Sequence, residues 1–433
     1  MARYLTVSLN DMKYFLLRSA FFVIMVLFFA TTETVELKAC LLLVFSFYFL
    51  IKSRKNPAVF LVAFFIGYCN FSIAVGEYLI GGGLAAPFDE VRNLGVYSPL
   101  LDVLLIFNLI VALFYNGASF DVVKIRSIAD VSNPFFYSVV FLALLAVFIF
   151  GVSRAPGVGY SVRITPYYEY SYILFLFCFM FSGAAREGFG FGCLREKAVA
   201  AGIIIYVVQD GYYGGRVTSV QLIYLLLLTC FARRLSVHGV IVFGISGIVF
   251  NKLVGVLRAG EVHFSVDSVI DVLGRFWGSF LVFDTPVYSY YASATHYAAS
   301  LYYGFSFKVV SFFYFVVGVV MGSPNEMGNV TSYVRSHLFF NQGGGVLPSH
   351  FFFWFGWPGV VMAAALVVFL LNSFATVRSR LGLMLLVIFV VTVSRWYLYT
   401  PLALLRPLFL CICLYVFSLF GKKIFSFKWS NLS

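Results

Sequence analysis

The chain has 433 residues, of which 62% are hydrophobic, 20% are aromatic and only 11% are charged. An ordinary globular domain has about 25% charged residues, and a helix needs about 20 apolar residues to cross a hydrocarbon core. The composition therefore excludes a soluble globular enzyme and indicates an all-α polytopic membrane protein. The net charge of +12 does not indicate nucleic-acid binding, because the basic residues lie in short loops between apolar runs.

Short charged segments divide residues 1–253 into nine predicted membrane spans. Arg3, Lys13 and Arg18 place the N-terminus in the cytoplasm, because cytoplasmic loops are enriched in Lys and Arg. The following loops then alternate between the two sides of the membrane. Those expected on the outer face are residues 76–99, 154–172 and 210–216.

Residues 254–350 are predicted to form a large outer loop that acts as a lid, and residues 351–433 add three spans and a basic cytoplasmic tail. Phe305–Met321 is apolar enough to cross, but a crossing would place Arg378 and Arg380 outside, against the positive-inside rule. We therefore expect this segment to be re-entrant, interfacial or packed within the lid. The result is about 12 spans, with both chain ends in the cytoplasm.

Apolar residues recur three and four apart along residues 265–284, which predicts an amphipathic helix on the membrane surface. Asp267, Asp271 and Arg275 fall four apart on its other face, where Asp271 and Arg275 can pair. Two interpretations stay open. The helix is a lid element with one surface ion pair, or Arg275 binds phosphate at the rim of a cavity.

Arginine, rather than lysine, is the basic residue of the predicted outer face. The arginines expected there are Arg154, Arg163, Arg216, Arg258, Arg275, Arg335 and Arg395. A planar guanidinium holds phosphate in two-point contact, so this set indicates an anionic lipid headgroup such as a lipid pyrophosphate. The alternative is that each arginine pairs with a carboxylate or reaches to the interface. For Arg216 that alternative is weaker, because Gly214 and Gly215 allow a ligand to approach closely.

The histidines predict no metal site and no cofactor. His263, His296, His337 and His350 lack metal-ligand spacing, and each is most simply a structural residue. An attacking sugar hydroxyl nevertheless benefits from a general base with a pKa near neutral. His350 is the best-placed candidate, at the mouth of a span after a flexible Gly343–Gly345 loop. Asp267 and Asp210 are the substitutes.

Tyrosines gather in two parts of the predicted outer face, residues 160–172 and 288–303. Their rings suit stacking against sugars. They suit equally an aromatic belt at the membrane interface, where Tyr and Trp are enriched.

Three segments resemble the O-antigen polymerase (Wzy-type) family, which joins lipid-linked oligosaccharide units at the periplasmic face. Gly214-Gly215-Arg216 opens a span, and residues 275–284 are similar to the family's Arg-led amphipathic segment. Residues 343–359 are similar to its Gly-rich loop leading into a span. His350 stands where members often have Glu, and Trp354 where they often have Asn.

The resemblance implies a GT-C-like transferase in the bacterial inner membrane, with its active site facing the periplasm. The donor would be a growing glycan on undecaprenyl pyrophosphate, and the acceptor a sugar hydroxyl of a new lipid-linked unit. Arg216, Arg258 and Arg275 would hold the pyrophosphate. The expected partners are these substrates, membrane lipid and a chain-length regulator among other glycan-assembly proteins, with no nucleic acid.

Other functions fit part of the pattern. A flippase for the same lipids should show repeated halves and ionisable residues at the middle of its spans, and these spans are nearly free of charge. A ligase that moves finished glycan to a lipid core would share the arginines and the lid. An acyltransferase using cytoplasmic acyl-CoA would need its histidine on the inner face, where only His238 is expected. A scaffold gives no reason for outward arginines.

Overall fold

The computed structural model describes residues 9–79, 95–153, 162–163, 166–184, 194–212, 217–259, 284–322, 325–339, 341 and 343–430. Regular structure in these ranges is almost entirely helical, which confirms the predicted all-α class. Strand pairing within them is limited to β1 (Val152–Ser153) with β2 (Val162–Arg163), antiparallel, and one isolated bridge between Ser132 and Ser182.

The helices fall into two runs along the chain. The first run is α1 (Leu9–Thr31), α2 (Val35–Ser53), α3 (Pro57–Ile73) with its π-helical extension η1 (Ala74–Leu79), α5 (Tyr97–Phe114), the 3-10 helix η2 (Val122–Asp130), α6 (Pro134–Phe150), the 3-10 helix η3 (Pro166–Tyr170), α7 (Ser171–Phe181), α8 (Leu194–Tyr212) and α9 (Val217–Leu228). The second run is α10 (Val237–Ala259), α12 (Asp284–Tyr302), α13 (Phe305–Met321), the 3-10 helix η4 (Glu326–Gly328), α14 (Val330–His337), α15 (Leu347–Phe355), α16 (Trp357–Ser373), α17 (Arg380–Val391), α18 (Val393–Leu398) and α19 (Leu402–Ser430).

Two apolar helices begin with the same Asn-Pro sequence. Asn56 accepts a hydrogen bond from Val59 N at the start of α3, and Asn133 accepts one from Phe136 N at the start of α6. The capping amide satisfies a backbone N–H that has no partner within the helix. The following proline occupies the first helical position, where its missing N–H costs nothing.

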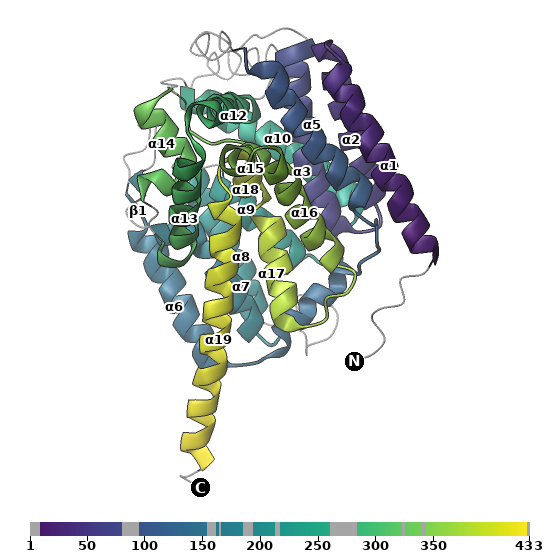
Figure 1. Ribbon diagram of the computed structural model, residues 1–433. Coiled ribbons are helices and arrows are strands. Elements are labelled where there is room, and N and C mark those ends of the chain that lie inside the picture. The colour runs from purple at the N-terminus through teal and green to yellow at the C-terminus, as the bar shows by residue number, and fades with distance from the viewer. Residues whose placement is uncertain are drawn as a thin grey trace, which may run out of the picture.

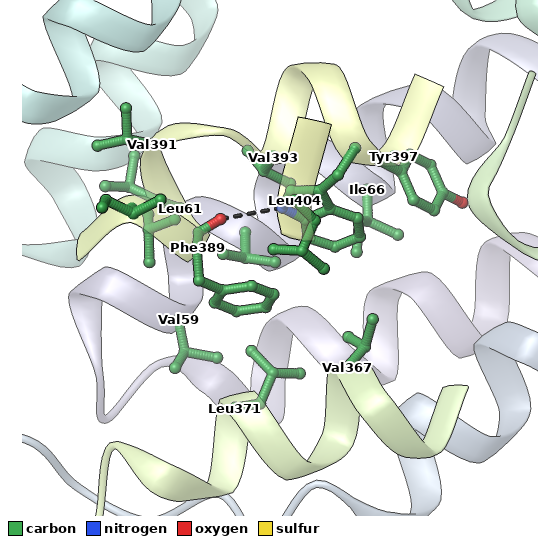
Figure 2. Packing of buried hydrophobic residues seen from close by; sticks show 14 of the residues in the cluster. Val59, Leu61, Ile66, Val367, Leu371, Phe389, Val391, Val393, Tyr397 and Leu404 are labelled. Carbon is green, nitrogen blue, oxygen red and sulfur yellow. Dashed lines mark hydrogen bonds between the residues drawn. The ribbon is translucent and has the colours of Figure 1, made fainter. Parts of the chain in front are cut away.

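The core lies where α3, α16, α17 and α18 meet. Figure 2 shows Val59 and Ile66 of α3 beside Val367 and Leu371 of α16, all with exposed fractions of 0–1%. Between α17 and α18 the chain bends, and the dashed line marks the hydrogen bond that the Trp396 indole donates to Phe389 O at 2.9 Å. This bend directs the end of α18 toward α12 and α15, with which α18 also packs.

Three described helical segments are long and apolar enough to cross a membrane: Met12–Thr31, Pro57–Leu79 and Leu402–Leu419. Shorter apolar helices of 10–17 residues accompany them, among them α6, α13 and α16. The segment in α3 is largely buried, whereas those in α1 and α19 are mostly exposed. A protein surrounded by water does not expose so much apolar helix surface, so these findings support an α-helical membrane protein.

The chain folds back on itself after α13. Ser311 Oγ donates to Met327 O at 2.7 Å, and a Cβ at Gly328 would lie 2.8 Å from Phe315 N. Farther along, the Tyr333 ring of α14 lies 5.1 Å from the Phe307 ring at the start of α13. The segment from η4 to α14 therefore runs antiparallel to α13, and α14 ends on the side where α13 begins.

The predicted span 351–371 is wrong as one continuous helix. Gly356 has φ +62° and separates α15 from α16, and Pro358 follows in the first turn of α16. A proline ring clashes with the carbonyl four residues earlier, so the helix cannot continue through this point. The consequence is a short helix, α15, whose residues Leu347–Trp354 are all buried.

The predicted lid is partly described. α10 continues to Ala259, into the range assigned to the lid. The predicted amphipathic helix 265–284 lies outside the described residues except for its last residue, which begins α12. In Figure 1, α12 and α14 lie at the upper side of the molecule, and the C-terminal part of α19 extends from the lower side.

Candidate functional site

A small cavity of about 70 Å³ lies between four helices, beside the first turns of α9 and α12. Its lining comes from α3 (Phe65, Tyr68), α9 (Val217, Val220), α12 (Thr285, Pro286) and the end of α18 (Ser394, Leu398, Tyr399). Val217 is the first residue of α9 and directly follows Arg216 in the sequence, and Thr285 is the second residue of α12. The first turns of these two helices therefore line the cavity.

Ser394 lines the cavity and carries a hydroxyl group that has no hydrogen-bond partner. The residue is 6% exposed, and its hydroxyl oxygen is buried and makes no hydrogen bond. A buried hydroxyl is normally hydrogen-bonded, because leaving it unpaired costs about 1–3 kcal/mol. The oxygen itself is buried, so a ligand oxygen in the cavity would satisfy it after a rotation of the Ser394 side chain.

Arg395 follows Ser394 and forms an ion pair with η3. Its guanidinium lies 2.8 Å from Glu169 Oε1 and 5.5 Å from the centre of the Tyr399 ring. The alternative that an outward arginine pairs with a nearby carboxylate thus holds for Arg395. The pair is partly exposed, with 21% of the Arg395 side chain and 37% of the Glu169 side chain accessible.

Arg406 brings a second guanidinium group to η3, the helix that carries Glu169. It lies 5.1 Å from the centre of the Tyr170 ring and donates to Gly322 O at 2.6 Å. Both Arg395 and Arg406 interact electrostatically with the Tyr170 phenol. The two guanidinium groups and the Glu169 carboxylate together carry a net positive charge. This net charge favours the binding of an anion.

His296 and His350 form a buried pair beneath the end of α18. Their ring centres are 4.6 Å apart, and both side chains are at most 1% exposed. The His350 Nε2–H donates to Tyr399 O at 3.1 Å, since a carbonyl oxygen can only accept. His350 thereby holds the backbone of a residue whose ring lies against Arg395.

His296 lies between two hydroxyl groups. Its Nδ1 is 3.1 Å from Ser349 Oγ, and its Nε2 is 3.2 Å from Thr331 Oγ1. The Thr331 hydroxyl also donates to Gly344 O at 2.6 Å, so it accepts from the Nε2–H of His296. The Ser349 hydroxyl also lies 2.8 Å from Val346 O, so its single proton is shared between that carbonyl and the Nδ1 of the neutral His296 ring.

Burial keeps both imidazoles neutral. α12 and α15 lie outside the helices that qualify as spans. Desolvation lowers the pKa of His350 to about 4, although the carbonyls of Tyr399 and Gly345 oppose this shift. Desolvation, with a smaller contribution from His350, also lowers the pKa of His296 well below its usual range.

The Gly343–Gly345 loop is closely packed at its last residue. Gly345 N donates to Leu398 O at 2.9 Å, and a Cβ at Gly345 would collide with the His296 ring and lie 2.9 Å from His350 Nε2. All three glycines have positive φ. Only glycine allows the backbone to pass between the histidines and the end of α18.

Asp210 lies at a different junction, between α8 and α9. The residue is 3% exposed, and its Oδ2 accepts from Ser219 N at 3.0 Å and from Ser219 Oγ at 2.9 Å. It thus caps the first turn of α9 from outside the helix. This bond fixes the two ends of the loop that carries Arg216.

The remaining predicted site residues are described in part. Arg335 is exposed on the last turn of α14. Arg163 lies in β2 and Arg258 in α10, but their side chains are outside the description. Those wholly outside the described residues are Arg154, Arg216, Arg275 and Asp267.

Three residues of this region were missed as site candidates in the sequence. Glu169 stood among outer-loop tyrosines, Ser394 within an apolar run, and Arg406 at the end of a span. A charge inside an apolar run is costly, so Arg406 was the one readable signal. Within the described part, no group of three or more His, Cys, Asp or Glu side chains could hold a metal ion.

No known protein family, no curated protein and no solved structure matches the chain.

Proposed function

We propose that the chain is a polymerase of lipid-linked oligosaccharide repeat units, acting at the periplasmic face of the bacterial inner membrane. The growing glycan on undecaprenyl pyrophosphate is transferred to a sugar hydroxyl of a new lipid-linked unit. The observation that carries this proposal is the cavity with the unpaired Ser394 hydroxyl next to Arg395. The cavity lies beside the first turns of α9 and α12, which are expected at the outer face, where a lipid headgroup sits.

The proposed topology has twelve spans with both ends in the cytoplasm. The twelve helices are α1, α2, α3, α5, α6, α7, α8, α9, α10, α16, α17 and α19. The return of η4 and α14 along α13 supports a lid that enters and leaves on one side.

The chemistry needs stabilisation of the leaving pyrophosphate. Guanidinium groups placed where charge develops lower the barrier for its departure from an oxocarbenium-like sugar. We assign this role to Arg395 and Arg406, together with Arg216, Arg258 and Arg275 from the bordering segments. Arg154, Arg163 and Arg335 would bind the flanking substrate.

The hydrogen bonds and burial of His350 and Asp210, two of the three candidate bases, indicate their roles. His350 and Asp210 are 1% and 3% exposed and are hydrogen-bonded to Tyr399 O and to Ser219, so we assign both as positioning residues. Asp267 then becomes the general base that takes the proton from the attacking hydroxyl.

Glycan length in a deletion strain tests the proposal. Deletion should leave surface glycan with a single repeat unit, and wild type should restore long chains. Arg395→Ala should fail to restore them, whereas Arg395→Lys, which keeps the charge but not the planar fork, should restore part. Arg378→Ala, an exposed arginine expected on the cytoplasmic side, is the matched control and should behave as wild type.

One observation favours a flippase of the same lipids as the second candidate. The interrupted helix formed by α15 and α16 is typical of transporters, in which broken helices surround the substrate. The same deletion separates the two functions. A strain that loses surface glycan altogether supports the flippase, and unchanged chain length contradicts both.

A further inference from the structure

Three hollows follow one another along α9, starting at the candidate site. The small cavity shares Phe65, Tyr68 and Val220 with a second hollow of about 250 Å³ between α3, α9 and α10. That hollow shares Ile223, Leu227 and Phe243 with a third, of about 280 Å³, at the other end of α9. We name the three together the α9 groove.

The α9 groove follows a helix that covers more than half of a membrane's hydrocarbon core. α9 has 12 residues, so at 1.5 Å per residue it covers about 18 Å of a hydrocarbon core about 30 Å thick. The second hollow is lined almost wholly by apolar side chains, and its polar groups are the hydroxyls of Ser246, Tyr68 and Tyr224. Among the described residues that line the three hollows, the only charged one is Arg234, which lines the third hollow.

Glycines of α10 create the space. A Cβ at Gly244 would collide with the Phe64 ring, so this glycine lets α10 approach α3 at one point. Gly247, one turn further, has no neighbour within 4 Å of a Cβ and lines the second hollow. The close contact at Gly244 holds α10 against α3, and the open space at Gly247 leaves the second hollow between them.

A groove of this composition in a membrane is filled by a hydrocarbon chain, because its few hydroxyl groups offer water too few hydrogen-bond partners. The polar end of the groove determines which hydrocarbon chain binds there. That end is the cavity with the unpaired Ser394 hydroxyl, beside the ion-paired Arg395. Resting on the proposed function, we infer that the α9 groove binds the isoprenoid tail of the lipid-linked substrate and thereby sets the position of its pyrophosphate at Ser394 and Arg395.

Tail-length preference measures this binding without any glycan chemistry. The purified full-length protein in detergent should bind undecaprenyl pyrophosphate at least tenfold more tightly than farnesyl pyrophosphate, whose short tail reaches only the first hollow. Gly247→Phe places a ring in the open second hollow and should remove this preference. Gly247→Ala adds one methyl to open space and should keep it.

Val242→Phe is the matched control, because Val242 lies on the same helix, is 64% exposed and lines none of the three hollows. It should bind as wild type, and equal thermal stability of both phenylalanine variants would show that the fold is intact. The inference is overturned if Gly247→Phe keeps the preference, if Val242→Phe loses it equally, or if phosphatidylglycerol displaces undecaprenyl pyrophosphate at equal concentration.

The outcome is separate from the glycan-length test. If chain length does not depend on the protein but the preference holds and Gly247→Phe removes it, the polymerase proposal fails and the groove stands. If chain length depends on the protein but wild type shows no preference, the groove fails and the polymerase proposal stands.

Discussion

At the scale of single residues, Gly345 has the most constrained surroundings in the site. It has φ +140°, a region that L side chains rarely adopt, and its missing Cβ gives room to His296 and His350. The two histidines, the backbone of Leu398 and the start of α15 all meet at this glycine. Its substitution therefore tests whether the histidine pair supports the cavity.

Gly345→Ala should destabilise the protein by about 2–5 kcal/mol, the sum of the left-handed backbone cost and overpacking. Gly343→Ala is the control, because it has φ +92° but nothing within 4 Å of its Cβ, so it carries only the backbone cost of about 1–2 kcal/mol. Thermal unfolding in detergent compares the two. Equal losses would show that the histidine rings can move aside.

The pKa values of the two histidines predict a loss of stability in acid. Each pKa is lowered in the folded protein, so the unfolded chain binds more protons below about pH 6.5. For His350 the effect grows as pH falls from about 6.5 toward its folded pKa of about 4. Each such group removes up to about 1.4 kcal/mol per pH unit within this window.

The melting temperature should therefore fall between pH 7 and pH 5, and His350→Gln should reduce the size of that fall. The glutamine amide can still donate to Tyr399 O but does not titrate in this range. A variant whose melting temperature falls as steeply as that of wild type would assign the acid sensitivity to other groups.

At the scale of helices, a buried ion pair joins η2 to α8. Arg126 NH1 and NH2 contact the two carboxylate oxygens of Glu196 at 2.7 Å and 3.1 Å, and the two residues are 5% and 1% exposed. Arg126→Ala should cost about 3–5 kcal/mol, because it leaves a buried carboxylate without its counter-charge. The double variant Arg126→Met with Glu196→Leu should recover most of that loss in a thermal melt. A double variant as unstable as Arg126→Ala would show that the pair itself holds η2 in place.

The sequence predicts helices well where a run is uniformly apolar and poorly where the backbone turns within the run. The pattern identified α13 with its bounds, because Gly304 and Gly322 end it on both sides. It joined α15 to α16, because average hydrophobicity does not register one glycine with positive φ. Gly356 followed by Pro358 was the local signal for the break.

The candidate site was harder to predict for a related reason. Residue type indicated Arg395 and His350, but the contacts that define their roles come from distant segments. Glu169 precedes Arg395 by more than two hundred residues, and His296 reaches Ser349 through a separation of 53. Pairings of this kind depend on tertiary packing, and single-sequence periodicity carries no information about them.

At the scale of the whole molecule, α13 and α14 decide the topology. Because α14 ends beside the start of α13, the two together return the chain to the side it came from. In the proposed topology, the later basic residues, including Arg378 and Arg380, therefore stay on the cytoplasmic side. One accessible position on α14 is therefore enough to test the arrangement of every helix that follows.

Ser332 is the suitable position, because it is exposed, whereas Gly328 is buried against α13. The natural cysteines first need replacement, since Cys40 and Cys413 are exposed. In that background Ser332→Cys should react with a membrane-impermeant maleimide added outside intact spheroplasts, and Arg378→Cys only after lysis. Reaction of Ser332→Cys only after lysis would place α14 in the cytoplasm and make α13 a crossing helix. Reaction of both from outside would contradict the positive-inside arrangement of the C-terminal helices and, with it, the placement of the cavity at the periplasmic face.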